Sequence, residues 1–159
     1  MGAGDVSADG PPDGPIGAVL FLCTRNQIRS VMAAELMRMR WGSMVRIDSA
    51  GIRPGELVDG MACAVMDEAG GDIMSYRPKG LDGFDEDDPP FDLIVSLSPE
   101  AHHTALNLVG TRAAAAEYWP TFDPSLAEGS RDQRLMEYRL VRDGLDKKIA
   151  ARFPRPSTG

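Results

Sequence analysis

The sequence predicts an α/β fold built around a parallel β-sheet with helices on both faces. Two observations lead to this prediction. Short apolar runs alternate along the chain with longer segments whose apolar residues recur every three or four positions, and this alternation is typical of parallel strands joined by helices. The length of 159 residues favours one domain with a single core.

The first predicted unit is a buried strand over residues 18–22, followed by a helix that runs to about Arg40. The strand segment is short and apolar and leads directly into Cys23. Ser30 is a candidate N-cap of the helix. Spacings of four and three residues predict that the core face of this helix holds Met32, Leu36 and Met39.

A second strand is expected over 45–48 and a second helix over 59–69, which the glycines at 70–71 end. Cys63 lies in the middle of this helix among small apolar residues. Because free cysteine behaves as a small hydrophobe, we expect a buried structural thiol there. The inward face of the helix is expected to hold Ala62, Val65, Met66 and Ala69.

An acidic loop over 82–90 precedes a strong central strand over 91–97. The next helix begins with Ser98 as its cap and Pro99 in its first turn, and it ends near Gly110. Together these segments repeat the strand–helix order of the first half of the chain.

A short strand is expected over 112–118, because the alternation requires another sheet element, although the alanines there favour a helix locally. A loop over 119–125 follows. Ser130 caps the last helix and forms a capping box with Gln133, and Phe153 marks its end. The apolar face of this helix consists of Leu135, Tyr138, Val141, Leu145 and Ile149.

The composition excludes several classes of protein. With 24 acidic and 17 basic residues, the net charge is −7, whereas a general nucleic-acid binder carries a basic face. No apolar run approaches the ~20 residues of a membrane span, and residues 1–17 lack the pattern of a signal peptide. We therefore expect a cytoplasmic protein without nucleic-acid or membrane partners, with flexible tails over 1–17 and 154–159.

The strongest chemical signal is Cys23 at the carboxyl end of the first strand, with Arg29 at the end of the loop that leads into the following helix. Helix N-termini bind anions and favour thiolates. The planar guanidinium of arginine can hold two oxygens of a phosphate or an arsenate. This pair therefore suggests attack by sulfur on phosphorus or arsenic.

Such a reaction also needs support for the thiolate and an acid for the leaving group. Ser30 can hydrogen-bond the sulfur of Cys23, and the backbone N–H groups of residues 24–29 can bind the oxyanion. Asp123, in a loop bracketed by Pro120 and Pro124, is the best candidate for the acid. Because the chain has only two cysteines, a disulfide scaffold and a structural zinc site are not expected. The acidic run over 85–88 lacks the alternating ligand spacing of a calcium site, and we expect no cofactor.

Four short motifs occur in an order that a known family shares. They are Cys23-Thr24-Arg25-Asn26-Gln27-Ile28-Arg29-Ser30, Ser49-Ala50-Gly51, Asp92-Leu93-Ile94-Val95 and Asp123-Pro124. In these motifs the chain resembles the low-molecular-weight protein tyrosine phosphatase superfamily, which also includes the thioredoxin-coupled arsenate reductases. The resemblance covers about residues 18–153.

The resemblance implies a flavodoxin-like three-layer fold with a central four-stranded parallel sheet and no metal. It implies that Cys23 is the nucleophile that forms a phosphocysteine and that Asp123 is the general acid and later the base. Asn26 and Ser30 would shape the loop and support the thiolate. The phosphoryl group would be bound by the loop residues Thr24, Arg25, Asn26, Gln27, Ile28 and Arg29.

The chain departs from the family pattern in ways that keep its function open. Arg25 stands where the family usually has glycine, Ile28 replaces a frequent second cysteine, and Ser125 follows Asp-Pro where the phosphatases often have tyrosines. Ser98 stands where a thioredoxin-coupled arsenate reductase would have the first of two relay cysteines.

Three functions are therefore considered. The first is a phosphatase that acts on a phosphorylated protein, through phosphotyrosine, or on a small aryl phosphate ester. The second is an arsenate reductase that uses an external small thiol. The third is a non-catalytic phosphate-binding or partner-binding protein. In each case phosphate, sulfate or vanadate is expected to bind the loop.

Overall fold

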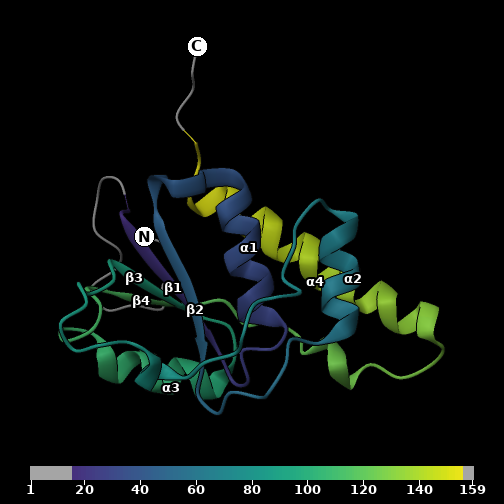
Figure 1. The fold of residues 1–159 in the computed structure, drawn as a ribbon, viewed down its shortest axis with the longest axis horizontal. Helices are drawn as coiled ribbons and strands as arrows, with labels where there is room; N and C mark the ends of the chain where they lie inside the picture. Colours follow the sequence, from purple (N-terminus) through teal and green to yellow (C-terminus); the bar gives the residue numbers. More distant parts are fainter. Residues whose placement is uncertain (1–15, 156–159) are drawn as a thin grey trace.

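The computed structural model describes residues 16–155 (Figure 1). Most of the two tails expected from the sequence therefore lies outside the described residues. Four parallel strands form one sheet in the order β2-β1-β3-β4. Their bounds are Ala18–Cys23 for β1, Arg46–Gly51 for β2, Leu93–Ser96 for β3 and Ala116–Tyr118 for β4.

Helices cover both faces of this sheet, as Figure 1 shows, with α1 and α4 on one face and α3 on the other. Helix α2 packs against α4. The predicted α/β, flavodoxin-like three-layer class with a four-stranded parallel sheet is confirmed. The helices are α1 at Arg29–Trp41, α2 at Gly60–Glu68, α3 at Pro99–Leu108 and α4 at Arg131–Arg152. No helix among residues 16–155 is long and apolar enough to cross a membrane.

Strand β1 supplies side chains to the cores on both faces of the sheet. Val19, Phe21 and Cys23 belong to the core under α1 and α4, whereas Leu20 and Leu22 belong to the core under α3. Successive side chains of a strand point to opposite faces. Because helices cover both faces of the sheet, every side chain of β1 is buried. The last residue of β1, Cys23, thus lies on the face where α1 begins.

The predicted helix signals near the carboxyl end of the chain are confirmed. Ser130 and Gln133 form a capping box at the start of α4, with N···O distances of 3.1 and 2.7 Å. All five residues of the predicted apolar face of α4 are buried. Ser98 caps α3, and Pro99 is its first residue.

Three predictions about buried faces are wrong. Met39 is 45 % exposed, because it lies over the turn at Gly70 and Gly71 and not over the sheet. Helix α2 packs mainly on α4 and not on the sheet. Consequently Ala62, Val65 and Met66 are buried, but Ala69 is exposed and Cys63 is only half-buried.

Glu68 joins α2 to α4 through Arg139 and Arg142, whose guanidinium nitrogens lie 2.8 and 2.9 Å from its carboxylate. These hydrogen bonds lower the pKa of Glu68 to about 2. A lowered pKa stabilises the fold above the unfolded-state pKa of about 4.5, and this contribution is lost as the pH falls through about 2.

We therefore expect Glu68→Gln to lower the Tm at pH 7, and we expect the difference from the parent to shrink between pH 4.5 and pH 2. Because all three groups meet solvent, added salt should also reduce the difference. Thermal unfolding across this pH range measures both effects, with Glu86→Gln as the control. A difference that is the same at every pH would contradict the assignment.

Candidate active site

Residues 24–28 form the loop between β1 and α1, and a neighbouring segment fixes their orientation. Backbone N–H groups within residues 52–59 donate hydrogen bonds of 2.8–3.1 Å to the carbonyl oxygens of residues 23–25 and 27. The N–H of each peptide group points away from its own C=O. The following N–H groups are therefore turned toward the opposite side of the loop, where the N–H of Asn26 lies 3.3 Å from the sulfur of Cys23.

Gly51 permits this close approach of the loop to the end of β2. A Cβ atom at this position would lie 2.8 Å from the backbone of Arg25 and Asn26 and 2.9 Å from the carbonyl oxygen of Thr24. No side chain fits without displacing the loop. The glycine of the Ser49-Ala50-Gly51 motif therefore has a steric role in forming the oxyanion cradle.

The sulfur of Cys23 is buried, and its position is set by Ser30 and Asn26. The hydroxyl oxygen of Ser30 lies 2.9 Å from the sulfur. The side-chain amide of Asn26 donates to the hydroxyls of Ser30 and Ser49, at 2.8 and 3.0 Å, which uses both of its hydrogens. Because Ser30 accepts from Asn26, its own hydrogen is free to point at the sulfur and stabilise a thiolate.

Ser30 is therefore not the helix cap that the sequence suggested. Helix α1 begins at Arg29 with Ile28 in the cap position, and no side chain in the described part of the chain caps it. Ser30 lies inside the first turn, where it is fully buried beside Cys23. The Ser30 hydroxyl contacts the buried sulfur of Cys23 and therefore does not cap the helix. Among residues 16–155, no side chain accepts a hydrogen bond from the first N–H groups of α1.

A second group of residues holds Asn26, which adopts a positive φ of 55°. Its side-chain oxygen accepts hydrogen bonds from the backbone N–H of Lys79 and the hydroxyl of Tyr76, at 2.9 and 3.1 Å. The ammonium of Lys79 in turn binds Asp48 at 2.6 Å. Burial acts to lower the pKa of Lys79, but the hydrogen bond to Asp48, the negative charge of Asp48 and the contact with Tyr76 together raise it above its usual value. A chain of polar contacts thus supports the loop from behind.

Ser30→Ala tests the link between this network and the sulfur. We expect iodoacetamide to alkylate Cys23 several-fold more slowly at pH 6, because the thiolate loses a donor. We also expect a loss of about 1–3 kcal/mol in the free energy of unfolding, because a buried N–H of Asn26 loses its acceptor. Ser43→Ala, on the surface, is the control. Unchanged alkylation kinetics would refute this role for Ser30.

Arg29 connects the cysteine loop to the loop that carries Asp123. One guanidinium nitrogen of Arg29 donates to the carbonyl of Thr121 at 3.1 Å, and the other lies 3.9 Å from a carboxylate oxygen of Asp123. The second carboxylate oxygen of Asp123 accepts from the N–H and the hydroxyl of Ser125, at 3.0 and 2.7 Å. The candidate acid is thus held in a defined orientation beside the arginine.

These two loops enclose a cavity of about 230 Å³. The cavity is lined by Cys23, Thr24, Arg25, Gln27, Ile28, Arg29, Asp59, Asp123 and Ser125. The structure therefore brings together the predicted nucleophile, arginine and acid. Asn26, which the resemblance places among the phosphate-binding residues, does not line the cavity with its side chain, because that side chain is turned into the network behind the loop.

The charges around the cavity are mixed. Arg25 and Arg29 are basic, and Arg25 is exposed and forms no ion pair within residues 16–155. Asp59 is a second carboxylate that the sequence did not indicate. It caps α2 and accepts a hydrogen bond of 3.2 Å from Tyr138, whose pKa is raised first by burial and then by Asp59 and Asp123.

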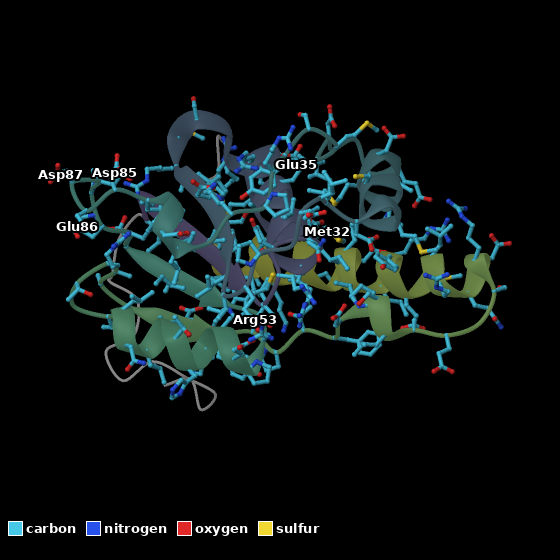
Figure 2. All side chains as sticks on the ribbon, turned by 60° about the horizontal axis from the view of Figure 1, so that its bottom comes forward. Met32, Glu35, Arg53, Asp85, Glu86 and Asp87 are labelled. Atoms are coloured by element: carbon cyan, nitrogen blue, oxygen red, sulfur yellow. The ribbon has the colours of Figure 1, made fainter. Side chains whose placement is uncertain are left out.

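The acidic loop lies far from this cavity. Figure 2 shows Asp85, Glu86 and Asp87 at the outer edge of the molecule, at the end opposite α4, whereas Arg53 lies near the centre of the view. Arg53 donates its backbone N–H to Thr24 and pairs with Glu100. In the part of the chain that the structure describes, no cluster of His, Cys, Asp and Glu could hold a metal ion.

The chain is similar to known proteins over most of its length. Residues 18–151 match the family model of low molecular weight phosphotyrosine protein phosphatases. The arsenate reductase of Halalkalibacterium halodurans is 30 % identical over 131 residues, which cover 82 % of this chain and 91 % of the relative. The arsenate reductase of Bacillus subtilis is 28 % identical over the same shares of the two chains.

Solved structures share the fold. An arsenate reductase in the phosphate-binding state superimposes with a TM-score of 0.66 and 25 % identity, over 89 % of this chain and 99 % of the other. A tyrosine phosphatase of Erwinia amylovora superimposes with a TM-score of 0.68 and 19 % identity, over 90 % and 97 % of the two chains. The second likeness concerns the fold alone.

Proposed function

Because this chain belongs to the low molecular weight phosphotyrosine protein phosphatase family, we propose that it is a cysteine-dependent phosphatase that acts on phosphotyrosine or a small aryl phosphate. The observation that carries this proposal is the meeting of Cys23, Arg29 and Asp123 at one cavity. The three groups correspond to a nucleophile, an oxyanion binder and a proton donor.

In the first step the Cys23 thiolate attacks phosphorus. A sulfur–phosphorus bond forms, the bond from phosphorus to the ester oxygen breaks, and Asp123 gives its proton to the departing oxygen. The guanidinium of Arg29 and the inward N–H groups of the loop bind the equatorial oxygens of the phosphoryl group. The Ser30 hydroxyl, 2.9 Å from the sulfur, stabilises the thiolate before attack.

In the second step water hydrolyses the phosphocysteine. The Asp123 carboxylate, now without its proton, accepts one from the attacking water. The sulfur–phosphorus bond breaks, phosphate is formed, and the Cys23 thiolate is regenerated. Both steps use the same acid and base, so one carboxylate at the cavity suffices. Phosphate, sulfate and vanadate are expected to compete for the same cradle.

A second candidate function is arsenate reduction with an external small thiol, which the names of the curated relatives favour. Arsenate would bind the cradle, and Cys23 would displace one of its oxygens as water. A first external thiol would attack the Cys23 sulfur, the sulfur–arsenic bond would break with its electron pair going to arsenic, and arsenic(V) would leave as arsenic(III). A second external thiol would then attack the resulting mixed disulfide, which releases the Cys23 thiolate and the disulfide of the two external thiols. The chain's other cysteine, Cys63, lies on α2 and lines a different cavity, so the electrons would have to come from outside.

One paired assay distinguishes the two functions. The protein is offered para-nitrophenyl phosphate at mildly acid pH without thiol, and arsenate with glutathione, mycothiol or reduced thioredoxin. We expect release of phosphate in the first assay and no arsenate-dependent thiol oxidation in the second. Thiol oxidation without phosphate release would favour the reductase, and vanadate binding without either activity would favour a binding protein.

A further inference from the structure

An apolar groove lies along α4, beside the loop that carries Asp123. It consists of two adjoining hollows of about 260 and 590 Å³, which share Phe122 and Glu137 in their walls. Phe122 immediately precedes Asp123, so the same loop borders the groove and the candidate active site. A chain bound in the groove would therefore pass close to the catalytic cavity.

The groove exposes large apolar side chains. Phe122, Met136 and Leu140 are 52 %, 53 % and 59 % exposed and line the two hollows. Met136 and Leu140 are one helical turn apart, and Gly144 continues the same row. A cluster of exposed apolar residues with a common hollow is typical of a surface that binds another chain.

Gly144 has no evident role within this chain. A Cβ at this position would meet no atom of residues 16–155 within 4 Å, and glycine is among the least favourable residues in the interior of a helix. Its absent side chain keeps the smaller hollow open, because Gly144 forms part of the wall. This is the arrangement expected where another chain approaches the helix backbone closely.

The rim of the groove is mainly acidic. Glu128, Asp132 and Glu137 border the larger hollow, and none of them forms an ion pair with a cation among residues 16–155. Lys148 lies at the wall of the smaller hollow. An apolar surface with unpaired carboxylates on its rim is complementary to a segment that carries both an apolar and a basic side chain.

We propose that this groove binds the segment of a phosphorylated protein substrate that flanks its phosphorylated residue, and that this segment carries an apolar and a basic side chain. The inference rests on the proposed phosphatase function and narrows its substrate from aryl phosphates in general to proteins. A second copy of the chain fits less well, because a two-fold interface would bring the three carboxylates of each copy together.

The test compares three kinds of substrate: para-nitrophenyl phosphate, phosphotyrosyl peptides with Leu and Arg near the phosphotyrosine, and the matched peptides with Ser and Gln in their place. Leu and Arg are placed before the phosphotyrosine in one peptide and after it in another. Gly144→Leu adds a bulky side chain at the groove wall, where a Cβ has open space, and Glu137→Gln removes one rim charge. Ala151→Leu is the matched control at an exposed position of α4 outside the groove.

We expect kcat/KM for one of the Leu–Arg peptides to exceed that for its Ser–Gln counterpart by about tenfold. Gly144→Leu should remove this preference, and Glu137→Gln should reduce it by about threefold. Ala151→Leu should preserve it, and all three variants should hydrolyse para-nitrophenyl phosphate like the parent.

Three results would overturn the inference. Equal turnover of the matched peptides by the parent would mean that the groove does not recognise the residues that flank the phosphotyrosine. An equal loss in Ala151→Leu would place the effect outside the groove. A parent dimer in light scattering that Gly144→Leu converts to a monomer would assign the groove to a second copy. Absence of para-nitrophenyl phosphate turnover would instead overturn the proposed function, and the inference with it.

Discussion

Cys23→Ser is expected to reduce hydrolysis of para-nitrophenyl phosphate below detection, a loss of about 10⁴-fold or more. The serine hydroxyl is far less ionised than a thiol at the assay pH, so no strong nucleophile remains. The substitution exchanges a single atom at a site where the hydroxyl of Ser30 and the N–H of Asn26 already provide hydrogen-bond partners. The fold and the oxyanion cradle should therefore persist.

Binding of phosphate, followed as protection against thermal unfolding, separates loss of chemistry from loss of structure. We expect the Cys23→Ser variant to keep this protection. Cys63→Ser is the matched control, because Cys63 lines another cavity, and it should keep full activity. Turnover by Cys23→Ser at even a hundredth of the parent rate would mean that another group attacks phosphorus.

Asp123→Asn is expected to lower kcat for phenyl phosphate by about 10²–10³-fold, because no acid remains to protonate the departing oxygen. The amide oxygen of asparagine can still accept from Ser125, so the loop should keep its position. The loss should be smaller for para-nitrophenyl phosphate, whose departing oxygen needs less protonation. The difference between the two esters is the signature of a general acid.

Steady-state kinetics with the two esters, measured from pH 5 to 8, test this role. The control is Asp85→Asn, on the acidic loop at the far edge of the molecule (Figure 2), which should leave both rates unchanged. If Asp123→Asn slowed both esters equally, the carboxylate would be acting on the loop structure and not as the acid. If neither ester were affected, the proton would have to come from elsewhere.

The sequence predicted the fold where local signals and burial agree. The capping box at Ser130 and the apolar face of α4 were predicted correctly, because both depend on residues within a few positions of one another. The prediction that Ser30 caps a helix was wrong, because its hydroxyl contacts the buried sulfur of Cys23. The prediction that Met39 is buried was wrong, because residue spacing within a helix does not show where the sheet beneath the helix ends.

The residues of the candidate site also fall into those that the sequence predicted and those that it did not. Cys23, Arg29 and Asp123 could be nominated from the sequence, because each combines a reactive group with a position at a strand end or in a proline-bracketed loop. Tyr76 lies 50 residues from its partner Asn26, and Asp59 enters the cavity through the packing of α2. The hydrogen bonds between residues 52–59 and the cysteine loop join backbone atoms, so no pattern of side chains in the sequence predicts them.

The central claim is that Cys23 accepts the phosphoryl group, and rapid acid quenching followed by mass spectrometry tests it most directly. The protein is mixed with para-nitrophenyl phosphate, quenched within one turnover and digested. We predict that the peptide containing Cys23 gains the mass of one phosphoryl group, that the adduct decays as phosphate appears, and that Cys23→Ser gives none. Turnover of the ester without any such adduct, or an adduct on another residue, would contradict the account.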